Sequence, residues 1–171
     1  TNQENLQVLR GTAEVLAPSE KVSHMQEFHR PSVSIDNKRE RFQQMLSLVR
    51  GMEPIPTAVA HPCDKESLKG PVIAFHEGII EPILVGPESR IRGVAEEFGI
   101  DLHGIRIVNA KHSHDAAAIA VSLVRTGDAE ALMKGSLHTD ELMAEVVARA
   151  NGLRTARRIS HVFLMNVPTY H

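Results

Sequence analysis

The chain has 171 residues, of which 42% are hydrophobic and 23% are charged, a composition typical of a globular protein rather than a disordered one. The net charge at pH 7 is only -2, which gives no basic surface for nucleic acid or for an anionic membrane. The single cysteine, Cys63, excludes an internal disulfide, and no apolar run approaches the ~20 residues of a membrane-spanning helix. Because the chain also opens on polar residues, these features predict a soluble cytoplasmic protein.

Residues 1–18 contain an isolated strand pattern. Thr12, Glu14 and Leu16 alternate with their neighbours at the two-residue period of a strand, yet a lone strand needs a sheet to pair with. This segment is therefore either the last strand of an upstream domain or a flexible leader. Residues 19–37 are polar and have no clear period, which is typical of a linker.

A helix is predicted after the linker. Asp36 or Asn37 can cap it. One face then carries apolar residues at the spacing i, i+3, i+4 and i+7, namely Phe42, Met45, Leu46 and Val49. Gly51 favours the end of this helix, and Pro54 prevents it from resuming.

From residue 57 onward, strand and helix patterns alternate. Short apolar runs predict strands at residues 57–60, 82–85, 105–108, 131–133 and 161–165. Amphipathic stretches lie between them at residues 64–78, 91–98, 116–124 and 142–147, and we expect Pro71 to kink or split the first. Strands that alternate with single helices predict an α/β fold with a mostly parallel, three-layer sheet.

Ligands of such sheets bind beyond the carboxyl ends of the strands, and the segment that follows residues 131–133 is the most informative there. It reads Lys134-Gly135-Ser136-Leu137-His138-Thr139. A glycine turn, two hydroxyls, a lysine and the amides of a helix capped by Thr139 suit a phosphate group. However, the order matches no Walker or dinucleotide loop, and Asp140 and Glu141 repel anions at a helix start. A phosphate site and a plain capped turn therefore explain the segment equally well.

Two other groupings are weaker candidates. Four arginines lie within residues 149–158 and could bind a phosphate, but a solvated loop after Asn151-Gly152 is the favoured interpretation. Of the ten histidines, His112 and His114 form the only close pair. Because no cysteine or tight acidic cluster completes a zinc set, we expect no metal site.

Neither of two nucleophile–histidine pairs predicts a catalytic triad. Cys63 follows His61 by two residues along a bending chain, and the carboxylate of Asp64 raises the pKa of the thiol, so we expect Cys63 to be inert. Ser160 and His161 are adjacent, and adjacent residues of a strand point to opposite faces.

Four stretches together resemble the phosphate acetyl/butyryltransferase family: residues 58–64, 81–87, 132–139 and 152–162. The chain is most similar to the bifunctional enoyl-CoA hydratase/phosphate acetyltransferases, in which a MaoC-like hot-dog domain precedes the transferase. Residues 10–15 resemble the final strand of that domain. The resemblance thus implies that residues 1–18 are its remnant, residues 19–37 a linker, and residues 38–171 the N-terminal part of a transferase domain whose second half is absent.

The resemblance implies a reaction as well as a fold. Members of this family transfer an acyl group reversibly between coenzyme A and inorganic phosphate, so that acyl-CoA and phosphate give acyl phosphate and CoA. They are dimers with an isopropylmalate-dehydrogenase-like fold and a site between two domains. The CoA thiolate attacks the acyl phosphate without a covalent enzyme intermediate. CoA is a substrate, and no cofactor or metal is implied.

Site residues follow from the same resemblance, position by position. The residues that match the loop facing the substrate cleft are Lys134, Gly135, Ser136, His138 and Thr139, and Lys134 and the loop amides are given the phosphate oxygens. Ser160 and His161 match a pair that shapes the same cleft. The acetyl branch carries an arginine after this loop, whereas this chain has residues 142–144 (Leu-Met-Ala) there and looks more like the butyryl branch.

The resemblance also places the catalytic base in the second half of the transferase. We therefore expect this chain to be an incomplete fragment, inactive alone. The alternative is a noncatalytic phosphate- or CoA-binding module that keeps the fold only.

Overall fold

The computed structural model describes residues 40–164, so the predictions for residues 1–18 and 19–37 lie outside the described part of the chain. The elements are α1 (Glu40–Val49), β1 (Ile55–Ala60), α2 (Lys65–His76), β2 (Ile80–Gly86), α3 (Glu88–Phe98), β3 (Arg106–Asn109), α4 (Ser113–Thr126), β4 (Ala131–Lys134) and α5 (Thr139–Val146). Strand and helix alternate from β1 onward, which confirms the predicted order. None of the described helices is long and apolar enough to cross a membrane.

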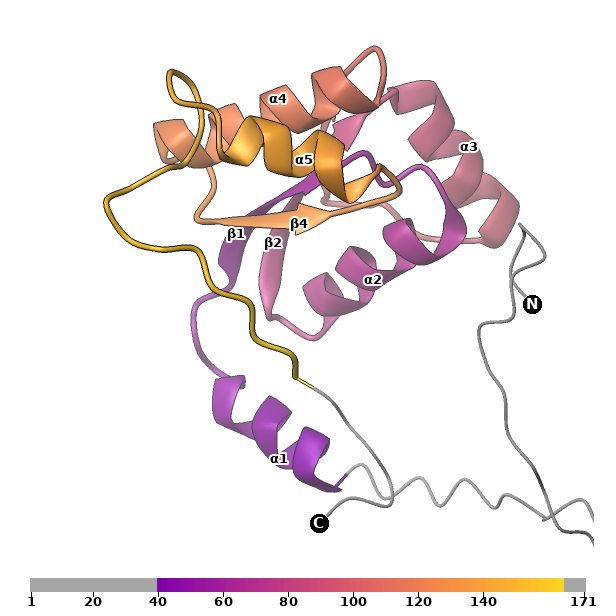
Figure 1. Cartoon of the computed structure of the whole chain (residues 1–171). Helices are drawn as coiled ribbons and strands as arrows, with labels where there is room; N and C mark the ends of the chain where they lie inside the picture. The colour runs from indigo at the N-terminus through magenta and orange to yellow at the C-terminus, as the bar shows by residue number, and fades with distance from the viewer. Residues whose placement is uncertain (1–39, 165–171) are drawn as a thin grey trace, which may run out of the picture. The chain divides into compact units, whose positions relative to one another are not determined.

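The four strands form one parallel sheet in the order β3-β2-β1-β4. At its centre Ala58 of β1 is in register with Ile83 of β2 and with Leu132 of β4. From β1 the chain moves outward to β2 and β3, and α4 then returns across the sheet to β4 on the other side of β1 (Figure 1). The strand order therefore reverses between β1 and β4, and ligands of open parallel sheets bind beyond the carboxyl ends of such a pair.

Helices cover both faces of this sheet. α4 and α5 contact one face, and α2 and α3 cover the other (Figure 1). The alternation of β1 divides the core accordingly, because Ala58 and Ala60 belong to the cluster under α4 whereas Val59 belongs to the cluster under α2 and α3. Strands that are buried on both faces need apolar side chains on both, which is why the sequence shows continuous apolar runs.

Pro71 was expected to kink or split its helix, and the split is wrong, because α2 continues from Lys65 to His76 through Pro71. The residue before it is Gly70, which has no Cβ to clash with the proline ring, and the Pro71 ring is fully buried. A capping box also supports the start of α2. The Asp64 carboxylate accepts from the N–H of Ser67 at 2.9 Å, and the Ser67 hydroxyl accepts from the N–H of Asp64 at 3.3 Å.

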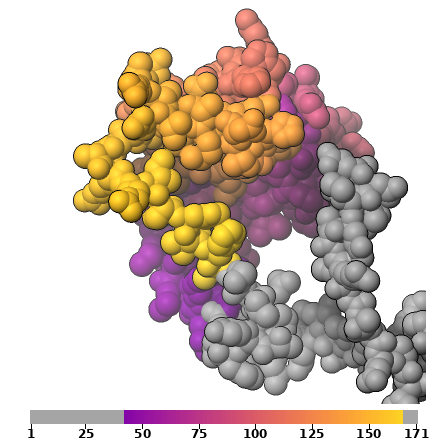
Figure 2. Space-filling view, viewed as in Figure 1, coloured from indigo at the N-terminus to yellow at the C-terminus, as the bar shows by residue number. Residues whose placement is uncertain are grey.

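The strand predicted at residues 161–165 is not formed in its described part. Residues 161–164 have no regular secondary structure, and Val162, Phe163 and Leu164 are exposed. Figure 2 shows this segment, in yellow, on the surface of the molecule. Strand-forming residues make a strand only when a partner supplies hydrogen bonds, and within residues 40–164 the edge strand β4 pairs with β1 alone.

Candidate functional site

The loops that follow β1, β2 and β4 meet at the carboxyl edge of the sheet. The N–H of His61, the first residue after β1, donates to the carbonyl oxygen of Val85 at 2.7 Å. From the other side, the N–H of Gly135 donates to the carbonyl of Ala60 at 2.9 Å, and that of Ser136 donates to the carbonyl of His61 at 2.9 Å. The loop after β1 is thus held by both of its neighbours, at the point where the strand order reverses.

Gly135 is required for this close approach. A Cβ added to it would lie 2.6 Å from the carbonyl oxygen and 2.7 Å from the carbonyl carbon of His61, and nearer still to the carbonyl oxygen of Ala60. The glycine therefore accommodates the backbone of β1 and not a ligand. Since the N–H groups of Gly135 and Ser136 are both bonded to the loop after β1, these two amides do not face a phosphate, contrary to the role expected from the sequence.

The Ser136 hydroxyl adds further bonds to this junction between the loop after β1, at His61, and the loop after β4, at Gly135 and Ser136. It donates to the carbonyl of His61 at 2.8 Å, accepts from the N–H of Cys63 at 3.2 Å, and lies 3.3 Å from Nδ1 of His61. His61 is the only non-glycine residue with a positive φ in the described part of the chain, at 55°. These bonds from Ser136 hold His61 in that left-handed conformation.

Burial sets the protonation of the two reactive side chains of this loop. It lowers the pKa of His61, an effect that Arg90 adds to and that Glu141 and Asp64 oppose. Burial also raises the pKa of Cys63 to about 11. The charge of Asp64 contributes to this rise, and the charge of Arg90 opposes it. A neutral imidazole and a protonated thiol follow at neutral pH, which agrees with the expectation that Cys63 is inert.

We call residues 134–139, which connect β4 to the start of α5, the β4 loop. Three of its side chains are exposed, namely Lys134, His138 and Thr139. Nζ of Lys134 donates to the carbonyl of Gly135 at 3.3 Å and forms no ion pair within the described residues. His138, rather than the expected Thr139, is the N-cap of α5, and it makes no side-chain capping bond. The edge of the site thus offers an ammonium group, an imidazole and a hydroxyl beside an uncapped helix start, all of which suit an anion.

The two histidines considered as metal ligands have other roles. Nδ1 of His112 caps α4 by accepting from the N–H of Asp115 at 3.2 Å. Nε2 of His114 lies 3.7 Å from Oε1 of Glu141 and so connects α4 to α5, while Oε2 of Glu141 is buried without a partner. Within residues 40–164, no three side chains of the metal-ligating types come together.

Ser160 and His161 lie outside this junction. Both are exposed, and the His161 ring lies 4.1 Å from that of Phe163. Among the described residues, no hydrogen bond or ion pair connects them to the β4 loop. The arginines of residues 149–158 are exposed in the same irregular segment, as expected for a solvated loop.

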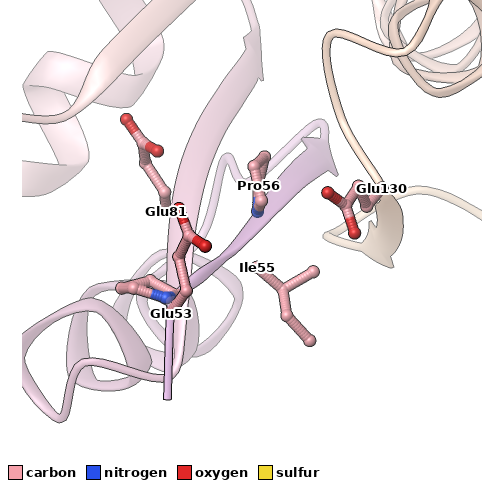
Figure 3. Close-up of a pocket in the computed structure, with 6 residues that line it drawn as sticks. Glu53, Ile55, Pro56, Glu81 and Glu130 are labelled. Atoms are coloured by element: carbon pink, nitrogen blue, oxygen red, sulfur yellow. The ribbon is translucent and has the colours of Figure 1, made fainter. Parts of the chain in front are cut away.

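A cavity of about 300 Å³ lies at the opposite, amino edge of the sheet. Its charged residues are all acidic, with Glu53 and Glu81 on one side of β1 and Glu130 on the other (Figure 3). Three carboxylates repel a phosphate, which leaves the carboxyl edge as the better place for an anionic ligand.

Comparison with known proteins relates this chain to one group of enzymes. No family model matches the chain. Over 128 residues, which are 75% of this chain and 40% of the relative, it is 56% identical to a phosphate acetyltransferase of Rhizobium meliloti. The chain is related to the phosphate acetyl- and butyryltransferases. A phosphate butyryltransferase of Clostridium acetobutylicum is 36% identical over 121 residues, which are 71% of this chain and 40% of that protein.

A solved structure of a phosphotransacetylase from Streptococcus pyogenes has the same fold. It matches 64% of this chain and 42% of its own length, with a TM-score of 0.55 and 17% sequence identity. The parallel α/β sheet expected from the phosphate acyltransferase resemblance is thereby confirmed. The chain spans about two fifths of the length of the curated relatives that it matches, 40% in both cases reported above.

Proposed function

We propose that this chain is the amino-terminal part of a phosphate acyltransferase, which converts acyl-CoA and phosphate to acyl phosphate and CoA. The observation that carries the proposal is the placement of Lys134, beside the uncapped start of α5, where the strand order reverses between β1 and β4. The sequence similarity to phosphate acyltransferases then supplies the class of anion.

The described residues divide into a binding group and a positioning group. Lys134, His138 and Thr139 bind the phosphoryl oxygens, and the lysine charge stabilises the negative charge that the reacting phosphate carries. Gly135 and Ser136 position this group, because their backbone bonds fix the loop to β1. Ser160 and His161 remain candidates for the same cleft on the grounds of family resemblance.

In the reaction, a phosphate oxygen attacks the acyl carbonyl carbon of acyl-CoA, the C–S bond breaks, and CoA leaves as the thiolate. In reverse, the thiolate attacks acyl phosphate. A buried thiol with a raised pKa is a poor nucleophile, which supports direct transfer without an acylated cysteine. CoA takes part as a substrate, and no further cofactor is proposed.

The remaining properties of the whole protein belong to the same proposal: a second half that supplies the base, a homodimer or larger homo-oligomer, a cytoplasmic location and an upstream hydratase domain. The acyl group is acetyl or butyryl. Identity is 56% to the relative named for acetyl transfer and 36% to the one named for butyryl transfer. This difference supports acetyl, although residues 142–144 look more like the butyryl branch.

The test is CoA release from acetyl-CoA and from butyryl-CoA, with and without phosphate, by this chain and by the intact protein that contains it. We expect phosphate-dependent release by the intact protein and none by the chain alone. In the intact protein, Lys134→Ala should raise the KM for phosphate about tenfold or more. Lys111→Ala is the matched control, because Lys111 follows β3 at the far edge of the sheet.

Two results would contradict the proposal. Turnover by the chain alone would show that the second half is dispensable. Absence of phosphate-dependent release by the intact protein would favour the noncatalytic binding module instead.

A further inference from the structure

Arg90 lies in the first turn of α3, directly after the loop that follows β2. The next residue, Ile91, is fully buried and anchors the start of the helix, whereas the Arg90 side chain is exposed. Gly86, at the end of β2, touches the loop after β1, because a Cβ on Gly86 would lie 3.5 Å from both the Cys63 Sγ and the His61 Cα. Arg90 therefore stands beside the candidate site, on the side opposite β4.

The charge of Arg90 acts along the whole loop after β1. Burial lowers the pKa of His61 most, and the charge of Arg90 lowers it further. The same charge opposes the rise that burial causes in the pKa of Cys63. Hydrogen bonds from Ser67 lower the pKa of Asp64, and Arg90 adds to that effect. These three groups occupy one short loop, and the influence of Arg90 on each of them agrees with its position beside that loop.

Arg90 forms no ion pair within residues 40–164, whereas its neighbour Arg92 does. The Arg92 guanidinium lies 2.7 Å from Oε1 of Glu88, and its Nε donates to the same oxygen at 2.8 Å. Among the acids at this edge, the Asp64 carboxylate accepts from the amide of Ser67. Arg90 thus carries a positive charge that forms no ion pair with a described acid, on the same sheet edge as Lys134.

We infer that Arg90 is a phosphate-binding residue of this site, which holds the phosphoryl oxygens from the β2 side of the β1 loop while Lys134 holds them from the β4 side. The guanidinium presents two parallel N–H donors that match a phosphate, which an ammonium group cannot do. α5 itself contains no arginine, so the bidentate contact comes from α3. The inference rests on the proposed function, because it takes phosphate as the ligand.

The test is a titration of the 171-residue chain with inorganic phosphate, followed through the backbone amide resonances of His138 and Thr139 by NMR. We expect Arg90→Ala to weaken phosphate binding about tenfold or more, and Arg90→Lys, which keeps the charge but loses the fork, to weaken it less. Arg92→Ala is the matched control on the same helix, and its affinity should equal that of the wild type because Glu88 already neutralises Arg92.

A second readout separates a binding role from general damage to the fold. The pKa of His61, measured from its ring resonances without phosphate, should rise in Arg90→Ala and stay unchanged in Arg90→Lys, since only the first removes the charge. Equal affinities of Arg90→Ala and wild type, an equal loss in Arg92→Ala, an unshifted His61 or a wild-type chain that binds no phosphate would each overturn the inference.

The two proposals fail in different ways. If the intact protein releases CoA with phosphate but Arg90→Ala binds phosphate normally, the acyltransferase stands and the role of Arg90 is refuted. If phosphate binding depends on Arg90 but the intact protein releases no CoA, the anion site stands and the acyltransferase is refuted.

Discussion

Replacing Gly135 by alanine should open the junction between β1 and β4. The new Cβ would lie 2.6 Å from the carbonyl oxygen of His61, against backbone that cannot rotate away. Relief requires the loop to move, which strains or breaks the bonds from the amides of Gly135 and Ser136, both 2.9 Å long. Two such bonds contribute about 1 kcal/mol each, and overpacking costs a similar amount, so we expect a loss of about 2–3 kcal/mol in the free energy of unfolding.

Thermal and urea unfolding, followed by circular dichroism, measure this loss. At about 2–4 °C per kcal/mol for a chain of this size, the midpoint should fall by roughly 4–12 °C. Gly93→Ala is the matched control, because a Cβ on Gly93 meets nothing within 4 Å, and alanine in a helix interior should stabilise the protein by up to about 1 kcal/mol. If Gly135→Ala unfolded within about 0.5 kcal/mol of the wild type, the close approach of these two loops would be refuted.

Three further outcomes are expected. Ser136→Ala should lower the free energy of unfolding by about 1–2 kcal/mol in urea, because the carbonyl of His61 loses the Ser136 hydroxyl as a donor and the N–H of Cys63 loses one of its two acceptors; a neutral effect would contradict the junction. Cys63 should react with a disulfide reagent at pH 8 only after denaturation, since its pKa of about 11 leaves little thiolate; fast native labelling would contradict this. The lowered pKa of His61 means that the unfolded chain binds more protons just below pH 6.5, so stability should fall there as pH drops. His61→Asn, which tolerates a positive φ, should remove this dependence, and an unchanged pH profile would refute the assignment to His61.

The alternation of elements could be predicted because the two central strands, β1 and β2, are buried on both faces. A run such as residues 82–85 is apolar throughout, and it lies inside β2, whose residues are buried except Glu81. The amphipathic stretch at residues 116–124 likewise lies inside α4. Local pattern was sufficient in these cases because burial imposes the same residue types wherever the element sits in the sheet.

The contacts that build the candidate site could not be predicted in this way. Ser136 bonds to the carbonyl of a residue 75 positions earlier in the chain, and no local pattern encodes such a pairing. The sequence therefore suggested that Gly135 admits a ligand, whereas it admits the backbone of β1. Arg90 lies in the first turn of α3, beyond the residues that directly follow β2, so a pattern limited to the ends of the strands does not include it.

The separation in sequence between β1 and β4 has a consequence for how the protein folds. β1 can pair with β2 across a short crossover, whereas the other edge of β1 pairs with β4, residues 131–134, which come much later in the chain. Closing this long loop costs more chain entropy than closing the short ones, and contacts of high sequence separation form slowly. During synthesis, β1, β2 and β3 can assemble first, with one edge of the central strand exposed. The junction of His61 with Gly135 and Ser136 then forms last, so binding of an anion at this edge would report that the sheet is complete.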